Sequence, residues 1–315
     1  MVYRGLCSKW PARRWDAKII SAALPQVRVS ISTSGTYPRD DATDSQCPTE
    51  QMPLKKFLEH LSRHSRRRQR SVVSGDEGNE GDGGLGGDVG SEGGSGRIRA
   101  SSSREHYYCH GNPLPDELFV DCPLPVTLRK QAKLVARRSL WISGDGASSP
   151  LHYDLPSVLL CQLRGRKRVF LYSPAHHDAC RPRGATFPAL TAQARIARTR
   201  RADLDRGVQR NGLYVELRPG DALLMPSGWW HEVESSVDAG DGDGDADELA
   251  DTCISVGFNW PSIADAIQNF KPWKEHVSDY PVLTQGQVLA EFYGAEKVRQ
   301  MPGFEAVRDL SVFAT

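Results

Sequence analysis

Two histidines and one aspartate in this sequence are spaced so that they could hold a metal ion. His152 and Asp154 are two positions apart in the segment SSPLHYDLPSVLL, and on a β-strand such residues point to the same face. His231 follows 79 residues later, at the end of an apolar strand, where a barrel could fold it back beside the first pair. Two imidazoles and one carboxylate hold a first-row metal on one triangular face and leave coordination positions open. The set favours iron(II), with manganese as a substitute, over zinc or magnesium.

The H-x-D spacing alone is common in surface loops. The interpretation as a metal site therefore depends on the segments that surround these residues. These segments are SPLHYD, QLRGRKRVFLYSP, RPGDALLMPSGWWHEVES and ISVGFNW. Together they resemble the JmjC (cupin-8) family of Fe(II)- and 2-oxoglutarate-dependent oxygenases. The resemblance is strongest to the small hydroxylase branch that includes the factor inhibiting HIF and the tRNA wybutosine hydroxylase. It is dense from about Leu140 to Trp260 and fainter from Gln26 to Cys122.

The resemblance implies a fold and a set of site residues. The fold is mainly β, a double-stranded β-helix of the jelly-roll or cupin type, with flanking helices. The residues that match the family's iron ligands are His152, Asp154 and His231. The residues that match positions binding the cosubstrate 2-oxoglutarate are Lys167, Ser149, Tyr108 and Asn259.

These cosubstrate positions each have a simpler interpretation. Lys167 matches the lysine that pairs with the far carboxylate of 2-oxoglutarate, and a cation inside a barrel needs such a counter-charge. As one of the cations in RGRKR it could otherwise be a turn charge in solvent. Ser149 could be a turn residue, and Tyr108 or its neighbour Tyr107 a core aromatic. Relatives commonly carry Asn six residues after the first ligand, where this chain has Val158, so one cosubstrate contact is expected to be missing.

Short strands separated by Gly and Pro turns are expected to position these residues. Alternation and β-branched composition predict strands in PQVRVSIST (25–33), SLWIS (139–143), residues 151–171 with a break at RGRK, GLYVEL (212–217), DALLMP (221–226) and CISVGFNW (253–260). Many short strands indicate a barrel or sandwich. Helical spacing places Leu54, Phe57, Leu58 and Leu61 on one face of a helix that lies on a sheet.

The expected organisation is one domain at 26–260 between two less regular ends. Residues 1–25 form a poorly defined N-terminal segment, and residues 261–315 are expected to form two C-terminal helices. The Gly- and Ser-rich stretch 71–105 is interpreted as a disordered insertion. The acidic stretch 238–251 is interpreted as a solvated loop, since it lacks the terminal Glu and flanking helices of a calcium-binding EF-hand.

Three other groups of residues are interpreted as structural. His60 and His64 have the i, i+4 spacing of a metal pair, but without a third ligand nearby in the sequence a solvated helix face is expected. A solvent-facing loop is expected for the cluster of His176, His177 and Asp178. The two tryptophans before the third ligand, Trp229 and Trp230, are expected to pack the end of the barrel and shield the metal rather than stack against a substrate.

The overall composition excludes some classes of protein. The 40 basic and 39 acidic side chains give a net charge of +1, so no overall field attracts nucleic acid or an acidic membrane. Seven cysteines without a C-x-x-C pair argue against a disulfide framework or zinc finger and favour the cytoplasm or nucleus. No apolar run is long enough for a membrane span or a secretory signal. The basic N-terminus leaves a mitochondrial targeting segment as a second interpretation.

The expected function is an Fe(II)- and 2-oxoglutarate-dependent dioxygenase that hydroxylates a macromolecule, either a protein side chain or a modified tRNA base. It would consume O2 and form succinate and CO2. The alternatives are a catalytically silent cupin that binds a partner, suggested by Val158, and a histone lysine demethylase. Arginines in residues 180–210 could supply the basic surface that tRNA requires. The C-terminal helices could mediate a homodimer.

Overall fold

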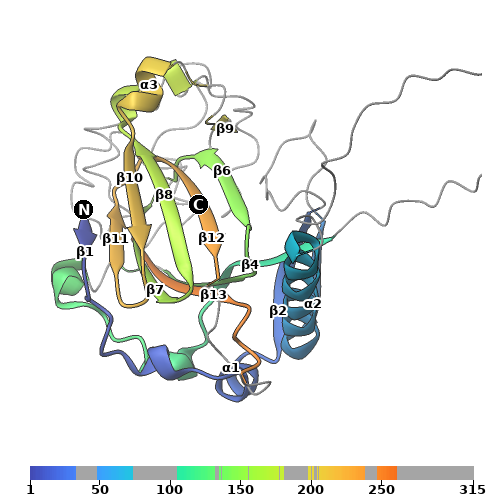
Figure 1. The fold of residues 1–315 in the computed structure, drawn as a ribbon. Coiled ribbons are helices and arrows are strands. Elements are labelled where there is room, and N and C mark those ends of the chain that lie inside the picture. Colours follow the sequence, from blue (N-terminus) through green and yellow to red (C-terminus); the bar gives the residue numbers. More distant parts are fainter. Residues whose placement is uncertain are drawn as a thin grey trace, which may run out of the picture.

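The computed structural model describes residues 1–32, 48–73, 105–131, 135, 137–154, 156–176, 178–180, 198–199, 201, 204, 206–237 and 247–260. In this part of the chain two antiparallel sheets form the framework (Figure 1). The larger sheet has eight strands in the order β1 (Val2–Tyr3), β11 (Ala222–Met225), β7 (Ser157–Arg164), β13 (Cys253–Trp260), β5 (Arg137–Ser143), β4 (His106–Pro113), β2 (Gln26–Ser32) and β3 (Thr49–Pro53). The smaller has five, in the order β10 (Leu213–Leu217), β8 (Arg166–Tyr172), β12 (Trp230–Ser236), β6 (Ser148–His152) and β9 (Arg198–Thr199). The mainly β jelly-roll prediction is confirmed.

Helices flank the sheets. The α-helices are α1 (Ala17–Ala23), α2 (Leu54–Val73) and α3 (Arg206–Arg210). The 3-10 helices are η1 (Pro11–Arg14), η2 (Asp116–Leu118), η3 (Val126–Gln131), η4 (Pro174–His176) and η5 (Asp178–Cys180). None of the helices in the described ranges is both long enough and apolar enough to cross a membrane.

Strand β7 is buried on both of its faces, which explains its unbroken apolar sequence. Leu159 and Leu163 point into a core that the larger sheet shares with the N-terminal segment and α2. Val158 and Leu160 point the other way, into a second core between the two sheets. Because successive side chains of a strand alternate between faces, one strand contributes to both cores. The side of β7 that faces the smaller sheet is the one that can contribute to an internal site.

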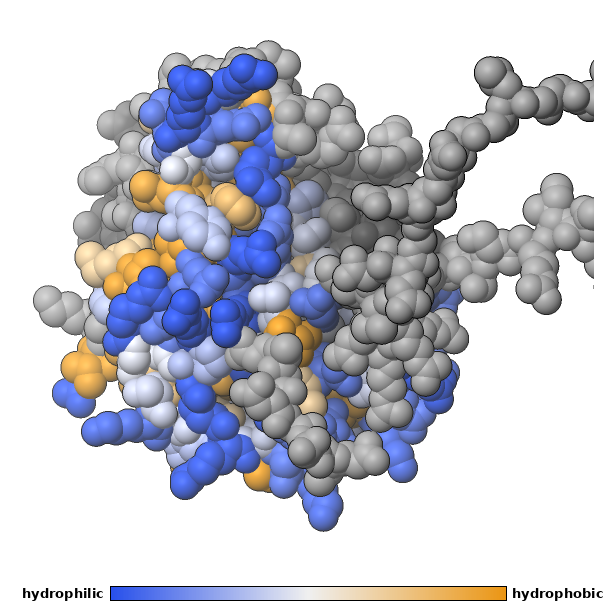
Figure 2. Space-filling view, in the orientation of Figure 1, coloured by the Kyte–Doolittle hydropathy of each residue, from blue (hydrophilic) through white to orange (hydrophobic). Residues whose placement is uncertain are grey.

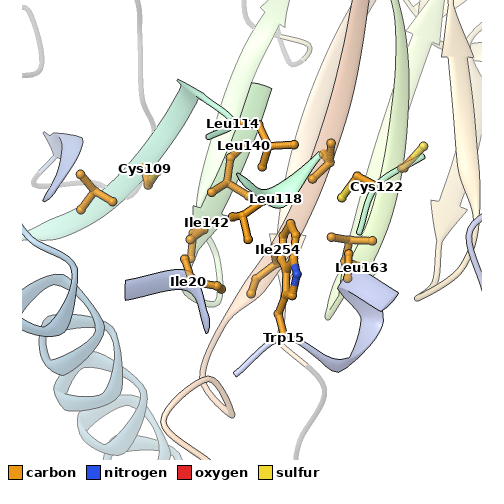
Figure 3. Packing of buried hydrophobic residues seen from close by; sticks show 14 of the residues in the cluster. Trp15, Ile20, Cys109, Leu114, Leu118, Cys122, Leu140, Ile142, Leu163 and Ile254 are labelled. Atoms are coloured by element: carbon orange, nitrogen blue, oxygen red, sulfur yellow. The ribbon is translucent and has the colours of Figure 1, made fainter. Parts of the chain in front are cut away.

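The core outside the larger sheet holds α2 in place. The four residues predicted for the buried face of this helix, Leu54, Phe57, Leu58 and Leu61, are all buried, which confirms the prediction. Figure 3 shows another part of the same core, where buried side chains from segments far apart in the sequence pack together. Burying a large apolar side chain contributes about 1.5–3 kcal/mol, so this layer fixes the larger sheet firmly.

The N-terminal segment, predicted to be poorly defined, forms elements of its own. Residues 1–25 contain β1, η1 and α1, and the side chains of Trp10, Trp15 and Ile20 are buried in the outer core. Asp16 caps α1, since its Oδ1 accepts a hydrogen bond from Ile19 N at 2.8 Å. The elements are too short to show a helical or strand period, which is why the sequence did not reveal them.

The boundaries of the two insertions also differ from the predicted ones. Helix α2 continues to Val73, past the predicted start of the first insertion at residue 71. At the end of the second, residues 247–251 are described: Leu249 is fully buried and Asp247 pairs with Arg164. Residues 74–104, 238–246 and the predicted C-terminal helices at 261–315 lie outside the described residues.

The histidines of α2 pack against the sheet, so the prediction of a solvated face is wrong. The His60 ring stacks on Tyr107 with ring centroids 4.2 Å apart, and His64 lies 4.2 Å from His106. Both side chains are half-buried. Helix α2 lies over β4, and this contact brings the rings together.

Candidate functional site

The three residues predicted as metal ligands meet inside the barrel. The ligand atoms of His152, Asp154 and His231 lie within 4.8 Å of one another, and within the described ranges no other group of His, Cys, Asp or Glu meets this condition. Asp154 Oδ2 is 3.9 Å from His152 Nε2 and 3.6 Å from His231 Nε2. Metal–ligand bonds of about 2.1 Å place neighbouring ligand atoms about 3 Å apart. The two distances from Asp154 to the histidines therefore exceed this spacing by less than about 1 Å.

Backbone carbonyl groups orient the two imidazole rings. His152 Nδ1 lies 2.6 Å from Pro150 O, and His231 Nδ1 lies 2.9 Å from Trp229 O. A carbonyl oxygen only accepts hydrogen bonds, so in each neutral ring Nδ1 carries the proton and donates it. Nε2 then keeps its lone pair on the side of Asp154. This is the arrangement by which proteins usually fix a metal-binding histidine.

Asp154 is held by a glycine turn rather than by the strand on which it was predicted. Strand β6 ends at His152, so Asp154 lies two residues beyond it. The backbone oxygen of Asp154 accepts a hydrogen bond from Gly228 N at 3.0 Å. Gly228 has a φ of 78°, a left-handed conformation that a side chain would strain.

His231 was predicted to lie at the end of the apolar strand 221–226. The same glycine turn separates it from that strand. β11 ends at Met225 in the larger sheet, and the chain then turns through Pro226–Trp229 into β12 of the smaller sheet. His231 is the second residue of β12. Strand β12 was missed because its inward face carries His231 and Ser235 and so lacks an apolar alternation.

A β-bulge lets Ser149 share the site with His152. His231 pairs with His152, and Val233 pairs with Ser149, so three steps along β6 lie opposite two steps along β12. The extra residue reverses the alternation of faces in β6. Ser149 and His152 therefore both line the internal pocket.

Lys167 is a buried cation in the same pocket. Its side chain is 2% exposed, and Nζ donates hydrogen bonds to Ser235 Oγ at 3.3 Å and Tyr108 Oη at 3.5 Å. Among the described residues no carboxylate forms an ion pair with it. Desolvation acts to lower the pKa of Lys167, but the neighbouring Tyr108 and Cys253 outweigh it, so the pKa is raised. A buried lysine cation calls for an anionic partner.

The pocket is elongated along the strands. His231 pairs with Leu171 of the neighbouring strand β8. Four residues further along β12, Ser235 pairs with Lys167 of β8. Four strand residues span roughly 13 Å. The metal ligands and the lysine therefore occupy different ends of one pocket, whose empty volume is about 450 Å³ when the space open to solvent is included. This shape suits an extended ligand with an anionic group at one end.

The remaining predicted cosubstrate residues also line this pocket. Tyr108 comes from β4, and Asn259 from β13, where its Nδ2 donates a hydrogen bond to Ser139 Oγ at 3.2 Å. Val158 lines the wall beside Asn259. Sequence reasoning missed Ser235, which accepts a hydrogen bond from Lys167. It also missed five lining residues, which are His110, Trp141, Leu160, Met225 and Val233. Val233 and Ser235 carried a signal, because residues 231, 233 and 235 share one face of a strand.

Some of the residues interpreted as structural can be placed in the described part of the chain. Trp230 is fully buried and meets Tyr153 edge to face, with centroids 4.9 Å apart, so it cannot stack against a substrate. His176 lies in η4 and is not among the described residues that line the pocket. Asp178 begins η5, and His177 lies outside the described residues.

The outer face of the smaller sheet is polar. Figure 2 shows mostly hydrophilic side chains with interspersed apolar ones over the described part of this side (Figure 2). Arg201 pairs with Glu232 at 2.9 Å and Glu234 at 3.3 Å, and its guanidinium lies 3.6 Å from the centre of the Phe170 ring. The charge of Arg201 is thus neutralised on the back of the strand that carries His231.

Two facing antiparallel sheets with a His-Asp-His group between them define a cupin-type barrel able to bind a metal ion. The chain belongs to the family described as the cupin-like domain, whose model matches residues 1–266. The match includes both the N-terminal segment and the candidate site.

Some of the curated relatives carry Jumonji names. The chain is 38% identical over 97 residues to the Drosophila melanogaster Jumonji C domain-containing protein 5, covering 31% of this chain and 24% of that protein. It is 28% identical over 134 residues to the Arabidopsis thaliana lysine-specific demethylase JMJ31, covering 42% and 22%. It is 24% identical over 243 residues to human HSPB1-associated protein 1, covering 74% and 44%. The chain thus spans less than half the length of these relatives.

Proposed function

We propose that this chain is an Fe(II)- and 2-oxoglutarate-dependent oxygenase that hydroxylates a macromolecule, consuming O2 and forming succinate and CO2. One observation carries the proposal: a His-Asp-His group and a buried lysine without a carboxylate partner among the described residues share one pocket. The relatives named as JmjC proteins support it. The small hydroxylase branch remains the preferred subgroup because of the sequence resemblance described above.

The donor set fits iron(II). Two neutral imidazole nitrogens and one carboxylate oxygen would occupy one face of the ion and leave positions for a chelating 2-oxo acid and for oxygen. When bound, the metal and its cosubstrate supply the oxidative chemistry. The chain's own residues would hold His152, Asp154 and His231 in place through the Pro150 and Trp229 carbonyls and the Gly228 turn.

Lys167 would bind the far carboxylate of 2-oxoglutarate. Tyr108 and Ser235 hold its ammonium group at the end of the pocket away from the metal ligands. Ser149 and Asn259 offer further polar groups along the pocket wall. The apolar side chains of Val158, Leu160 and Met225 line the rest and would keep water away from the bound cosubstrate.

Calorimetry and turnover test this proposal. The protein should bind 2-oxoglutarate in the presence of Mn(II), which binds like iron(II) but does not turn over, and should form succinate with Fe(II) and O2. The His231→Ala variant should lose both properties. His176→Ala, which removes a histidine outside the pocket, serves as the matched control and should keep both. Succinate formation equal in the His231→Ala variant and the unaltered protein would rule the oxygenase out.

Val158 favours a second candidate, a catalytically silent cupin that binds a partner. An apolar side chain at this position cannot supply the hydrogen bond that the common Asn of relatives can. Calorimetry separates the two: no detectable 2-oxoglutarate binding with Mn(II) would favour the silent cupin. A demethylase is the variant suggested by relatives with that name. Formaldehyde release from N-methyl-lysine peptides would identify it.

Protein and tRNA both stay candidate substrates. Of the arginines proposed to form a basic surface, Arg201 is paired with Glu232 and Glu234, Arg206 is exposed at the start of α3, and Arg181 and Arg183 lie outside the described residues. Binding of tRNA that weakens steeply with salt would select tRNA, and salt-insensitive or absent binding would select a protein. The proposed homodimer through residues 261–315 likewise lies outside the described residues.

A further inference from the structure

Gly257 in β13 gives room to the ring of Trp141. A Cβ atom on Gly257 would lie 2.5 Å from Cζ3 and 2.6 Å from Cη2 of Trp141. Real Cβ atoms essentially never approach other atoms so closely. Gly257 does not have the positive φ that would itself require glycine. Since glycine weakens a strand interior, its presence here is explained by the close approach of the indole.

The indole forms part of the pocket wall. Trp141 lines the pocket together with the metal-ligand group and Lys167. It packs against the buried cluster of Tyr108 and Ala147, and Tyr108 accepts a hydrogen bond from the lysine. Val158, which also lines the pocket, has its Cγ1 3.5 Å from the position that a Cβ on Gly257 would take. Val158 pairs with Asn259, which lies two residues beyond Gly257 towards the end of β13.

We infer that Trp141, seated on Gly257, sets the length of the 2-oxo dicarboxylate that the pocket admits. This inference rests on the proposed function. A ligand that joins the metal group to Lys167 must lay its methylene chain along the wall of this pocket, to which the flat apolar indole contributes. The depth at which the ring sits then determines how many methylene groups fit between the two ends.

Two perturbations move this wall in opposite directions. Gly257→Ala forces the indole to shift by about 1 Å to regain an ordinary carbon–carbon contact of about 3.5 Å, which narrows the pocket if the ring moves inward. Trp141→Leu removes the ring and widens the pocket. In the double variant Gly257→Ala, Trp141→Phe the smaller ring lacks the indole edge that clashes, so the pocket reopens.

The test measures dissociation constants of 2-oxoglutarate and 2-oxoadipate, which has one more methylene, by calorimetry with Mn(II). In Trp141→Leu the preference for 2-oxoglutarate over 2-oxoadipate should fall at least about tenfold, the usual discrimination per methylene. Gly257→Ala should weaken 2-oxoglutarate binding about tenfold or more, and the double variant should recover most of it. Thermal unfolding of each variant separates this effect from a loss of folding.

The outcomes distinguish this inference from the proposed function. A preference unchanged in Trp141→Leu, or Gly257→Ala binding 2-oxoglutarate as tightly as the unaltered protein, overturns the role of Trp141 while leaving the oxygenase intact. If the unaltered protein binds neither acid, the proposed function fails and the inference fails with it. Should Trp141→Leu not fold, Trp141→Phe with both acids gives the same comparison.

Discussion

The substitution Lys167→Met tests how the pocket recognises its cosubstrate. Methionine is similar in length and apolar, so it fills the space of the lysine stem while removing the charge. In the unliganded protein the ammonium is buried with two neutral hydrogen-bond acceptors, Ser235 and Tyr108. The substitution therefore removes a desolvated cation and should not lower the stability of the unliganded protein.

Binding of 2-oxoglutarate should change in the opposite direction. Removing one partner of a buried, hydrogen-bonded charge pair costs about 2–5 kcal/mol. At about 1.4 kcal/mol for each factor of ten, the dissociation constant should rise at least about 30-fold. Mn(II) affinity should be nearly unchanged, because Lys167 lies about four strand residues from the level of the metal ligands.

Three measurements on the same variant check this reasoning. Calorimetry with Mn(II) gives the two affinities, and chemical denaturation without ligands gives the free energy of unfolding. Leu160→Met, an apolar exchange in the same pocket, is the matched control and should bind 2-oxoglutarate nearly as before. Unchanged cosubstrate binding in Lys167→Met, combined with a lower free energy of unfolding, would show that the lysine has a structural role instead.

Three further predictions concern stability and the metal. Asp221 accepts hydrogen bonds from Arg218 N, Gly5 N and Arg4, and although burial opposes them these bonds lower its pKa. Because the pKa of Asp221 is lower in the folded than in the unfolded protein, its ionised form stabilises the fold at pH values above the unfolded-state pKa. This stabilisation is lost as pH falls through the folded-state pKa, so Asp221→Asn should lower the free energy of unfolding at pH 7 and flatten its decline below about pH 4. An unchanged decline at acid pH in denaturation experiments would contradict this. Gly228→Ala should cost about 1–2 kcal/mol and weaken Mn(II) binding, because the turn holds Asp154; calorimetry showing full affinity would refute the link. Mn(II) at 100 times its dissociation constant should stabilise the protein by about 2.7 kcal/mol, and a chelator or Asp154→Ala should abolish the rise in melting temperature; an equal rise in that variant would place the ion elsewhere.

The two sheets have different tasks in this molecule. The larger sheet is buried on both faces and anchored by α2 and the N-terminal segment. The smaller sheet carries His152, His231 and Lys167 on its inner face and charged pairs on its outer face. Rigid support from the larger sheet holds the pocket wall opposite these residues, as precise ligand positioning requires.

Some features followed from the sequence alone. The positions of Leu54 and Phe57 defined the buried face of α2, because side-chain period is a local property that residues at helical spacing share whatever the remainder of the chain does. The metal-ligand prediction had another basis. Asp154 lies beyond strand β6 and His231 follows 79 residues after His152, so the grouping of the three residues was expected from the resemblance of the surrounding segments rather than from a local period.

Other features were decided only by the tertiary structure. Strand β12 has a polar inner face, so nothing in its composition separated it from the turn before it, and its partners are set by pairing with β6 and β8. The contact of Trp141 with Gly257 and the burial of Lys167 without a nearby carboxylate among the described residues depend in the same way on which strands lie side by side. Strand pairing joins residues far apart in the chain, and its register is chosen by the packing of the whole barrel rather than by the residues of any one strand.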